Sequence, residues 1–195
     1  LNLTLKNLPV HFDNPAFRDD ALRAVGNTAR RIDELIARLS TLRQRPESNK
    51  EAADLNELVR EALQGTDGLA GLEIASELTP LPRVRVDREQ VKSVVVNLLL
   101  NARDAIDPAG RVAIRTEVRG GRVVLSVADD GCGMTEDFVR GSLFRPFHST
   151  KKHGVGIGMF QSRMIVEAHG GTIHVDTSPG RGTTFFVSLP PEVEP

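Results

Sequence analysis

Tryptophan and tyrosine are absent from this 195-residue sequence, its eight aromatic side chains are all phenylalanine, and its one cysteine is Cys132. A single cysteine excludes an internal disulfide and a cysteine-rich zinc site, and it is compatible with a reducing compartment. No apolar run approaches the roughly 18 residues of a membrane-spanning helix, and no signal-peptide pattern is present. We therefore expect a cytoplasmic protein, or the cytoplasmic part of a membrane-bound one.

The sequence also lacks an excess of either charge, since 25 basic residues stand against 26 acidic ones and the formal net charge is −1. Any anion must then be bound by a local arrangement of groups, which argues against a general binder of nucleic acid or of acidic membranes. The apolar fraction of 39% is ordinary for a globular protein and excludes gross disorder. The length fits one large domain, or a standard domain with an appendage.

A helix is predicted near the N-terminus, with Asn14 as its N-cap and Pro15 in the first helical position. Apolar residues then recur at spacings of three and four, at Leu22, Val25, Ala29, Ile32, Ile36 and Leu39, and Leu35 and Leu42 widen the seam. This heptad pattern favours a helix of a bundle over one amphipathic helix lying on its own domain. The polar residues 43–50 are interpreted as a linker.

Mixed helix and strand patterns follow the linker. We expect helices at 55–64, 87–106 and 156–169, strands at 72–78, 83–86, 111–118, 122–128, 172–175 and 183–189, and a long loop at 129–155. Asp87-Arg88-Glu89-Gln90 is typical of a capping box, in which the N-cap acid and the N3 amide bond reciprocally. Strands without regular β-α-β alternation predict an α+β fold, with a mixed sheet and helices on one face.

Three features carry possible chemistry, although the Gly-Lys of a phosphate-binding loop and a dinucleotide fingerprint are both absent. Asn97 and Asn101 share one face of a helix, Asp129 ends a strand just before two closely spaced glycines, and a glycine-rich turn begins another helix. Alone, each is usually a network residue, a tight turn or an ordinary loop. Their occurrence in this order, with a long loop between the last two, is much more specific for a ligand site than any one of them alone.

Together these segments resemble the catalytic domain of bacterial sensor histidine kinases, which belongs to the Bergerat-fold superfamily of gyrase-type and Hsp90-type ATPases. The similar motifs are an N box at 97–105, a first glycine box at 129–134, an F box at 143–151, a second glycine box at 154–159, and a terminal hairpin at 180–190. The resemblance covers about 52–190 and implies a two-layer α/β sandwich. More narrowly, Asp13-Asn14-Pro15-Ala16-Phe17 and Ser149-Thr150-Lys151 resemble exosortase-associated (PEP-CTERM) sensor kinases.

The resemblance implies a site for ATP and Mg²⁺. Asp129 would accept from the adenine amino group with help from Thr183 through a water, and Asn101 would give its oxygen to Mg²⁺. Phe144 and Phe147 would pack under a lid formed by 135–155, or serve as plain core aromatics. The full set of implied nucleotide-binding residues is Asn101, Asp129, Gly131, Gly133, Met134, Gly154, Gly156, Ile157, Gly158, Met159 and Thr183.

Two positions depart from the superfamily. Asn97 stands where ATP-hydrolysing members place a general-base glutamate, so hydrolysis should be poor and the phosphoryl acceptor should not be water. Asp104 stands where many histidine kinases carry a cation, and Arg103 lies about 100° away around the helix. Lys151, Lys152, Arg145 and His153 are then the candidate lid cations, of which we favour Lys151, or else they are solvated loop charges. Asn97 and Lys151 are the candidate catalytic residues.

The acceptor histidine is not evident. His11 does not match the family motif, so we expect the acceptor upstream of Leu1, with 1–46 as part of a dimerising helical hairpin and 52–195 as the catalytic domain. The resemblance further implies a homodimer and relay of the phosphoryl group to a response regulator. The rivals are a superfamily ATPase, a serine kinase and a degenerate nucleotide-binding module. His169 and His174 are interpreted as structural residues, because no partner is spaced to form a metal site.

Overall fold

A computed structural model describes residues 14, 17, 19–26, 49–69, 71–107, 109–149 and 155–192 of the chain. The chain divides into two compact units, Leu1–Pro46 and Glu47–Pro195. In the first unit residues 19–26 are helical, and the Phe17 N–H donates to Asn14 Oδ1 at 3.4 Å, which is the cap predicted for Asn14. His11, most of the predicted helix that starts at Pro15, and residues 150–154 of the predicted lid lie outside the described residues.

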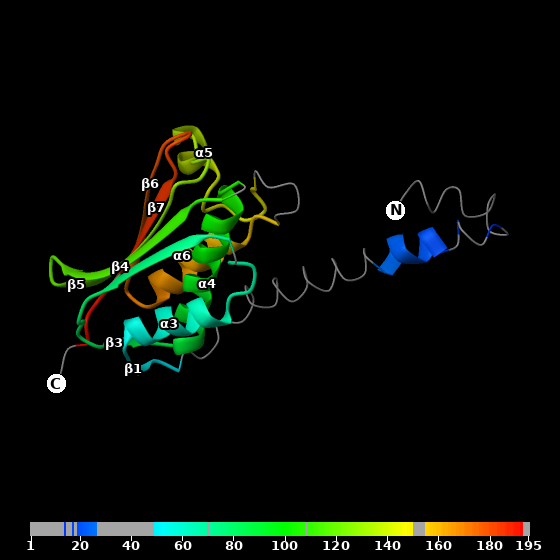
Figure 1. The fold of residues 1–195 in the computed structure, drawn as a ribbon. Helices are drawn as coiled ribbons and strands as arrows, with labels where there is room; N and C mark the ends of the chain where they lie inside the picture. Colours follow the sequence, from blue (N-terminus) through cyan, green and yellow to red (C-terminus); the bar gives the residue numbers. More distant parts are fainter. Residues whose placement is uncertain are drawn as a thin grey trace. The chain divides into compact units, whose positions relative to one another are not determined.

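A five-stranded sheet forms one layer of the second unit (Figure 1). Its order is β2 (Glu73–Leu78), β4 (Arg111–Arg119), β5 (Arg122–Asp129), β7 (Thr183–Leu189) and β6 (Thr172–Thr177). Only the β2–β4 pair is parallel, so the sheet is mixed, as predicted. A separate two-stranded sheet pairs β1 (Glu51–Ala53) with β3 (Val84–Val86).

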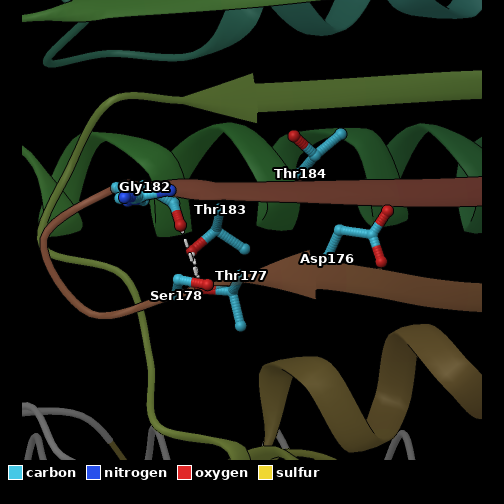
Figure 2. A pocket seen from close by; sticks show the side chains of 7 residues that line it. Asp176, Thr177, Ser178, Gly182, Thr183 and Thr184 are labelled. Carbon is cyan, nitrogen blue, oxygen red and sulfur yellow. Dashed lines mark hydrogen bonds between the residues drawn. The ribbon is translucent and has the colours of Figure 1, made fainter.

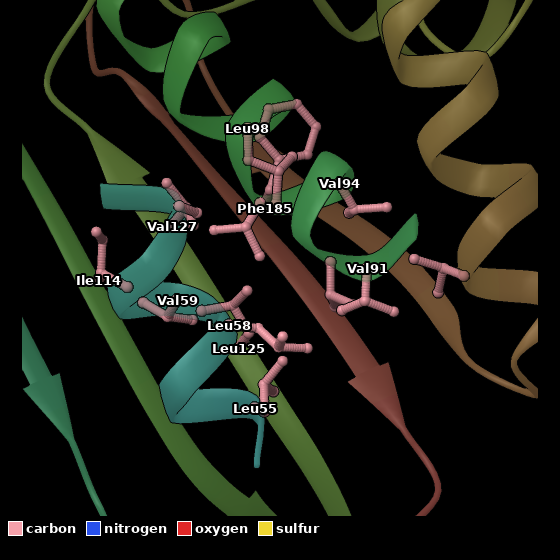
Figure 3. Packing of buried hydrophobic residues seen from close by; sticks show 14 of the residues in the cluster. Leu55, Leu58, Val59, Val91, Val94, Leu98, Ile114, Leu125, Val127 and Phe185 are labelled. Carbon is pink, nitrogen blue, oxygen red and sulfur yellow. The ribbon is translucent and has the colours of Figure 1, made fainter. Parts of the chain in front are cut away.

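Three helices, α3 (Leu55–Gly65), α4 (Arg88–Ala105) and α6 (Gly158–Ala168), cover one face of the five-stranded sheet (Figure 1). The core lies between the two layers (Figure 3), where α3 and α4 bring buried leucines and valines against side chains from the central strands, among them Leu58, Leu98, Ile114, Leu125 and Phe185. Along β7 every second residue is buried, because successive strand side chains point to opposite faces. The predicted α+β, two-layer fold class is confirmed.

The start of α4 corrects one expectation. Asp87 caps the helix as predicted, with Oδ1 accepting from the Gln90 N–H at 3.1 Å. The reciprocal half of the capping box is wrong: Gln90 Nε2 donates to Asp87 Oδ2 at 3.3 Å, and the Asp87 backbone N–H donates instead to His169 Nε2 at 3.0 Å. A tertiary contact with the end of α6 thus replaces the local one.

The segment predicted as one long loop also contains a helix, α5 (Glu136–Gly141), with Thr135 as its N-cap and Glu136 and Asp137 in its first turn. Six residues with no buried side chain leave no hydrophobic period, so the pattern was not visible in the sequence. The β4–β5 turn is as predicted: Gly120 and Gly121 have φ of 59° and 73°, a region that glycine enters without strain.

Candidate functional site

Helices α4 and α6 pack side by side, and polar side chains join the second half of α4 to the first turns of α6. Asn97 Nδ2 donates to Ser162 Oγ at 2.8 Å, and Asn101 Nδ2 lies 3.0 Å from Met159 Sδ. Because His169 at the end of α6 contacts Asp87 at the start of α4, the two helices run antiparallel. Both asparagines of the N box are therefore brought beside the second glycine box.

Asn97 fills the contact between these helices. A Cβ added at Gly158 would collide with Asn97 Oδ1, so glycine lets the first turn of α6 approach the amide. Ser162, which accepts from Asn97, is itself buried. An amide held in this way has no useful basicity, so Asn97 cannot activate water as a general base.

Asn101 lies between two of the other predicted motifs. Its amide nitrogen is directed at Met159 of α6, and one turn further along α4 the Ala105 carbonyl accepts from the Cys132 N–H at 2.9 Å. The two branches of a carboxamide diverge, so the Asn101 oxygen faces away from the Met159 sulfur. Helix α4 thus places the Asn101 side chain beside the second glycine box, one helical turn before its contact with the first.

Asp129 is the last residue of β5 and is half-buried. Burial raises the pKa of its carboxyl above the ordinary range, and the adjacent Asp130 acts in the same direction. The N–H groups of Gly131 and Thr183 oppose this rise by donating to the carboxyl, the former to Oδ1 at 3.0 Å. The site therefore contains a partly dehydrated carboxylate that is fixed from two sides as an acceptor.

Glycines let the loop after Asp129 close against its neighbours. A Cβ at Gly131 would collide with the Ala105 carbonyl, one at Gly133 with the Ser178 carbonyl, and one at Gly182 with the Asp129 carbonyl. Gly133 and Gly182 also have φ of 64° and 78°. These obstacles are backbone atoms that cannot rotate away, so the close approach requires glycine at all three positions.

The second glycine box opens α6. Gly156 has a φ of 72°, the N-cap residue Ile157 is buried, and it makes no side-chain capping bond. First-turn N–H groups of a helix without a side-chain cap, together with the helix dipole, suit an anion. Gly158 and Met159 begin this helix, whereas Gly154 lies outside the described residues.

The aromatic residues of the F box differ from the expectation. Phe147 is 60% exposed, so it does not pack under a lid or in the core here, and its φ of 66° is the one positive value among the described non-glycine residues. The Phe147 N–H donates to the Gly156 carbonyl, which ties this strained residue to the second glycine box. Phe144 is half-buried, and the Arg163 guanidinium lies over its ring at 5.5 Å from the centroid.

Of the candidate cations for the proposed phosphate site, only Arg103 and Arg145 are among the described residues. The Arg103 guanidinium pairs with Asp104 at 2.6 Å, and its Nη1 donates to the Asp67 carbonyl at 3.5 Å, so Arg103 is already held by other partners. Arg145 is exposed. Lys151, Lys152 and His153 lie outside the described residues, and Lys151 stays a prediction.

Sequence reasoning missed Thr177 and Ser162. Thr177, at the end of β6, accepts from the Met134 N–H at 2.9 Å and also bonds the terminal hairpin (Figure 2). A hollow of about 190 Å³ opens beside it, lined by Asp176, Thr177, Ser178, Arg181, Gly182, Thr183 and Thr184. Counting the register of the predicted hairpin back from Thr183 would have pointed to Thr177. Ser162 follows Gly158 by one helical turn and could have been found by that spacing.

The described residues show neither a metal cluster nor a membrane-spanning helix. They contain no group of three or more His, Cys, Asp or Glu side chains that could hold a metal ion. Among the same residues, no helix has both the length and the apolar character needed to cross a bilayer. His174 is exposed and lies 3.2 Å from Asp176, while His169 is buried with Nδ1 2.7 Å from the Ile165 carbonyl.

The site combines a half-buried acceptor carboxylate with a glycine-lined loop, an asparagine side chain and a helix start without a side-chain cap. Together these features are typical of a nucleotide-binding domain. Comparison with known proteins identifies its family: residues 86–193 match the histidine kinase-, DNA gyrase B- and HSP90-like ATPases. The chain belongs to this family.

Individual relatives are sensor kinases. Sensor histidine kinase ZraS of Klebsiella oxytoca is 36% identical over 83% of this chain. Among solved structures, the mycobacterial sensor histidine kinase MprB has a TM-score of 0.65 at 27% identity, covering 72% of this chain and 97% of that one. The catalytic domain of histidine kinase ThkA has a TM-score of 0.64 at 30% identity, with coverage of 72% and 95%. This chain spans only 36% of the length of ZraS.

Proposed function

We propose that the chain is the ATP-binding core of a sensor histidine kinase, which transfers the γ-phosphoryl group of ATP to a histidine for relay to a response-regulator aspartate. The observation that carries the proposal is the position of Asn101, between the loop after Asp129 and the start of α6. Helix α4 contacts both the loop after Asp129 and the first turn of α6, which supports a site that would bind the base at one end and the phosphates at the other.

The residues present fit ATP with Mg²⁺. Asp129 would accept from the adenine amino group, and the N–H groups at the start of α6 would bind phosphate. Asn101 would supply an oxygen to Mg²⁺, a hard cation that prefers such ligands and that neutralises phosphate charge. Gly131, Gly133 and Gly182 would let the backbone approach the base closely.

Asn97 argues for transfer over hydrolysis. The side chain at this position donates to Ser162 and offers no base toward water. Phosphoryl transfer depends mainly on positioning and electrostatic stabilisation, so a kinase does not need a glutamate there. This favours the kinase over the ATPase alternative, and the helix at 19–26 favours it over a serine kinase without a hairpin.

The proposed function also implies two protein partners, a response regulator and a second copy of the chain. ThkA, whose catalytic domain resembles this chain, is also known in complex with the response regulator protein TrrA. In the first unit Leu22 and Val25, both on the predicted helical seam, are 70% and 45% exposed. We propose a receiver domain as the downstream partner and a homodimer formed through this seam. The narrower PEP-CTERM resemblance stays a prediction.

Magnesium-dependent ATP affinity tests the site. Isothermal titration calorimetry with ATP should show tighter binding in Mg²⁺ than in EDTA for the wild type. Asn101→Ala should lose most of that gain, about tenfold or 1.4 kcal/mol, because the oxygen ligand is gone. Exposed Asn49, replaced by alanine, is the matched control and should keep the gain.

Two results would count against the proposal. An Asn101→Ala variant with an unchanged Mg²⁺ effect and unchanged thermal unfolding would remove Asn101 from the site. A folded wild-type protein that does not bind ATP would overturn the proposed function itself.

A further inference from the structure

Thr177 is a side chain to which the resemblance assigns no role, yet its hydroxyl joins strand β6 to two other segments of the site, the loop after Asp129 and the start of β7. It accepts from the Met134 N–H at 2.9 Å, donates to the Gly182 carbonyl at 3.0 Å and lies 3.0 Å from Thr183 Oγ1. Figure 2 shows Thr177 and Thr183 side by side at the end of the β6–β7 hairpin.

The three residues Asp129, Thr183 and Thr177 form a row across neighbouring strands. Asp129 of β5 is the register partner of Thr183 in β7, and Thr183 is the partner of Thr177 in β6. The Thr183 N–H also donates to the Asp129 carboxyl. A contact that fixes the Thr183 hydroxyl is therefore coupled to Asp129, the carboxyl proposed to accept from the base.

Counting protons fixes the direction of each hydrogen bond. A threonine hydroxyl has one hydrogen and two lone pairs. The Gly182 carbonyl can only accept, so it takes the hydrogen of Thr177, and the two lone pairs of Thr177 are left for the Met134 N–H and the Thr183 O–H. The hydrogen of Thr183 is thereby used, and Thr183 offers only lone pairs to anything else.

We propose that Thr177 is a positioning and specificity residue: it holds the Thr183 hydroxyl as an acceptor, so that the site selects a purine with an amino group over one with a carbonyl at the same position. The ionised Asp129 is also acceptor-only. Two adjacent acceptors favour an N–H of the base, directly or through a water, and leave a carbonyl without a donor. This rests on the proposed function, because it deepens the specificity of the same ATP site.

The test is the ratio of GTP to ATP dissociation constants, measured by competition against a fluorescent ATP analogue with the whole chain. In Thr177→Val the Thr183 hydrogen is released and can turn toward a carbonyl. The ratio should therefore fall roughly fivefold to tenfold. Thr177→Ser keeps the hydroxyl and should keep the wild-type ratio. Thr172→Val, an exposed threonine of the same strand, is the matched control.

A double-mutant cycle separates positioning from simple loss of structure. If Thr177 acts through Thr183, the ratio for Thr177→Val with Thr183→Val should equal that for Thr183→Val alone. The inference is overturned by a wild-type ratio in Thr177→Val, or by an equal loss in Thr177→Ser. Should the valine variant not fold, Thr183→Val decides alone, because a wild-type ratio there overturns the inference. Failure of the wild type to bind ATP would instead reject the proposed function.

Discussion

Burial raises the pKa of Asp129, so an ionised carboxylate at this position costs the folded domain free energy. The sign follows from proton binding. Between the ordinary pKa and the raised one, the folded state holds more protons than the unfolded state, so stability falls as pH rises through this window. Above the raised pKa, the free-energy cost of the ionised Asp129 carboxylate is fully present. An acceptor that is unfavourable for folding but suited to an amino group indicates a residue placed for binding.

Asp129→Asn should therefore separate stability from binding. The amide oxygen can still accept from the Gly131 N–H while the buried charge is removed, so the midpoint of thermal unfolding without nucleotide should stay unchanged or rise at neutral pH. ATP affinity should fall more than tenfold, because the two N–H donors hold the oxygen and direct an NH₂ group at the adenine amino group.

Calorimetry with ATP and thermal unfolding without it are the two measurements. Asp130→Asn is a neighbouring control for ATP affinity and should keep it, since that carboxylate accepts from the Arg111 N–H outside the proposed base site. Unchanged ATP affinity in Asp129→Asn would remove this residue from the site. A clear loss of stability in this variant would contradict the claim that the buried Asp129 charge destabilises the folded domain.

At the scale of elements, the local patterns predicted most helices and strands because their hydrophobic periods are long enough to read. The N-cap residues Asp54 and Asp87 each accept from a backbone N–H of the helix that they begin. Helix α5 and strand β1 were missed, since six and three residues carry no period. β1 also depends on a partner, β3, that lies some thirty residues away.

The candidate site also contains residues that the sequence predicts and contacts that only the packing determines. Its glycines and asparagines stand in ordered motifs and could be predicted. Spacing and register point to Ser162 and Thr177 only as candidates, because the contacts that these two residues make depend on how distant elements pack. The Asn97–Ser162 bond needs α4 packed on α6, and the Thr177 network needs the hairpin register. The exposed Phe147 depends on a backbone conformation with positive φ that its residue type does not suggest.

His169 joins the two nucleotide-site helices at their far ends. Its Nε2 accepts from the Asp87 N–H, and burial lowers the pKa of the imidazole. Lys50, which donates to the neighbouring Ala168 carbonyl, acts in the same direction, whereas the Ile165 carbonyl bonded to Nδ1 and the charge of Asp87 oppose the shift. A lowered pKa means that the unfolded state binds more protons between the folded pKa and 6.5. The stabilisation that neutral His169 contributes to the folded domain is thus complete above pH 6.5, and it is lost as the pH falls below that value.

The free energy of unfolding, measured with urea, should therefore decrease as pH is lowered from 7.5 to 5.5. His169→Gln keeps an acceptor for the Asp87 N–H but does not titrate, so this part of the pH dependence should vanish. His174→Gln, at an exposed histidine, is the control and should retain it. Identical pH profiles for the wild type and His169→Gln would show that His169 is not responsible.

The whole chain has near-neutral charge, and its proposed phosphate site needs no basic surface, since helix N–H groups and a cation would meet the anion. The chain also spans about a third of the length of ZraS, so the kinase reaction stays part of the proposed function. At position 97 the site carries an amide that donates to Ser162 and cannot act as a base toward water, which supports the proposed phosphoryl transfer over hydrolysis.

The chemical nature of the phosphorylated product tests this account most directly. A version extended at its N-terminus through the family's histidine motif is incubated with γ-labelled ATP and Mg²⁺, with Asn101→Ala as the inactive control. We predict label on the protein that is lost in acid and stable in alkali, as phosphohistidine is, with little free phosphate. Acid-stable label, rapid phosphate release without labelled protein, or ATP binding with no label would contradict it.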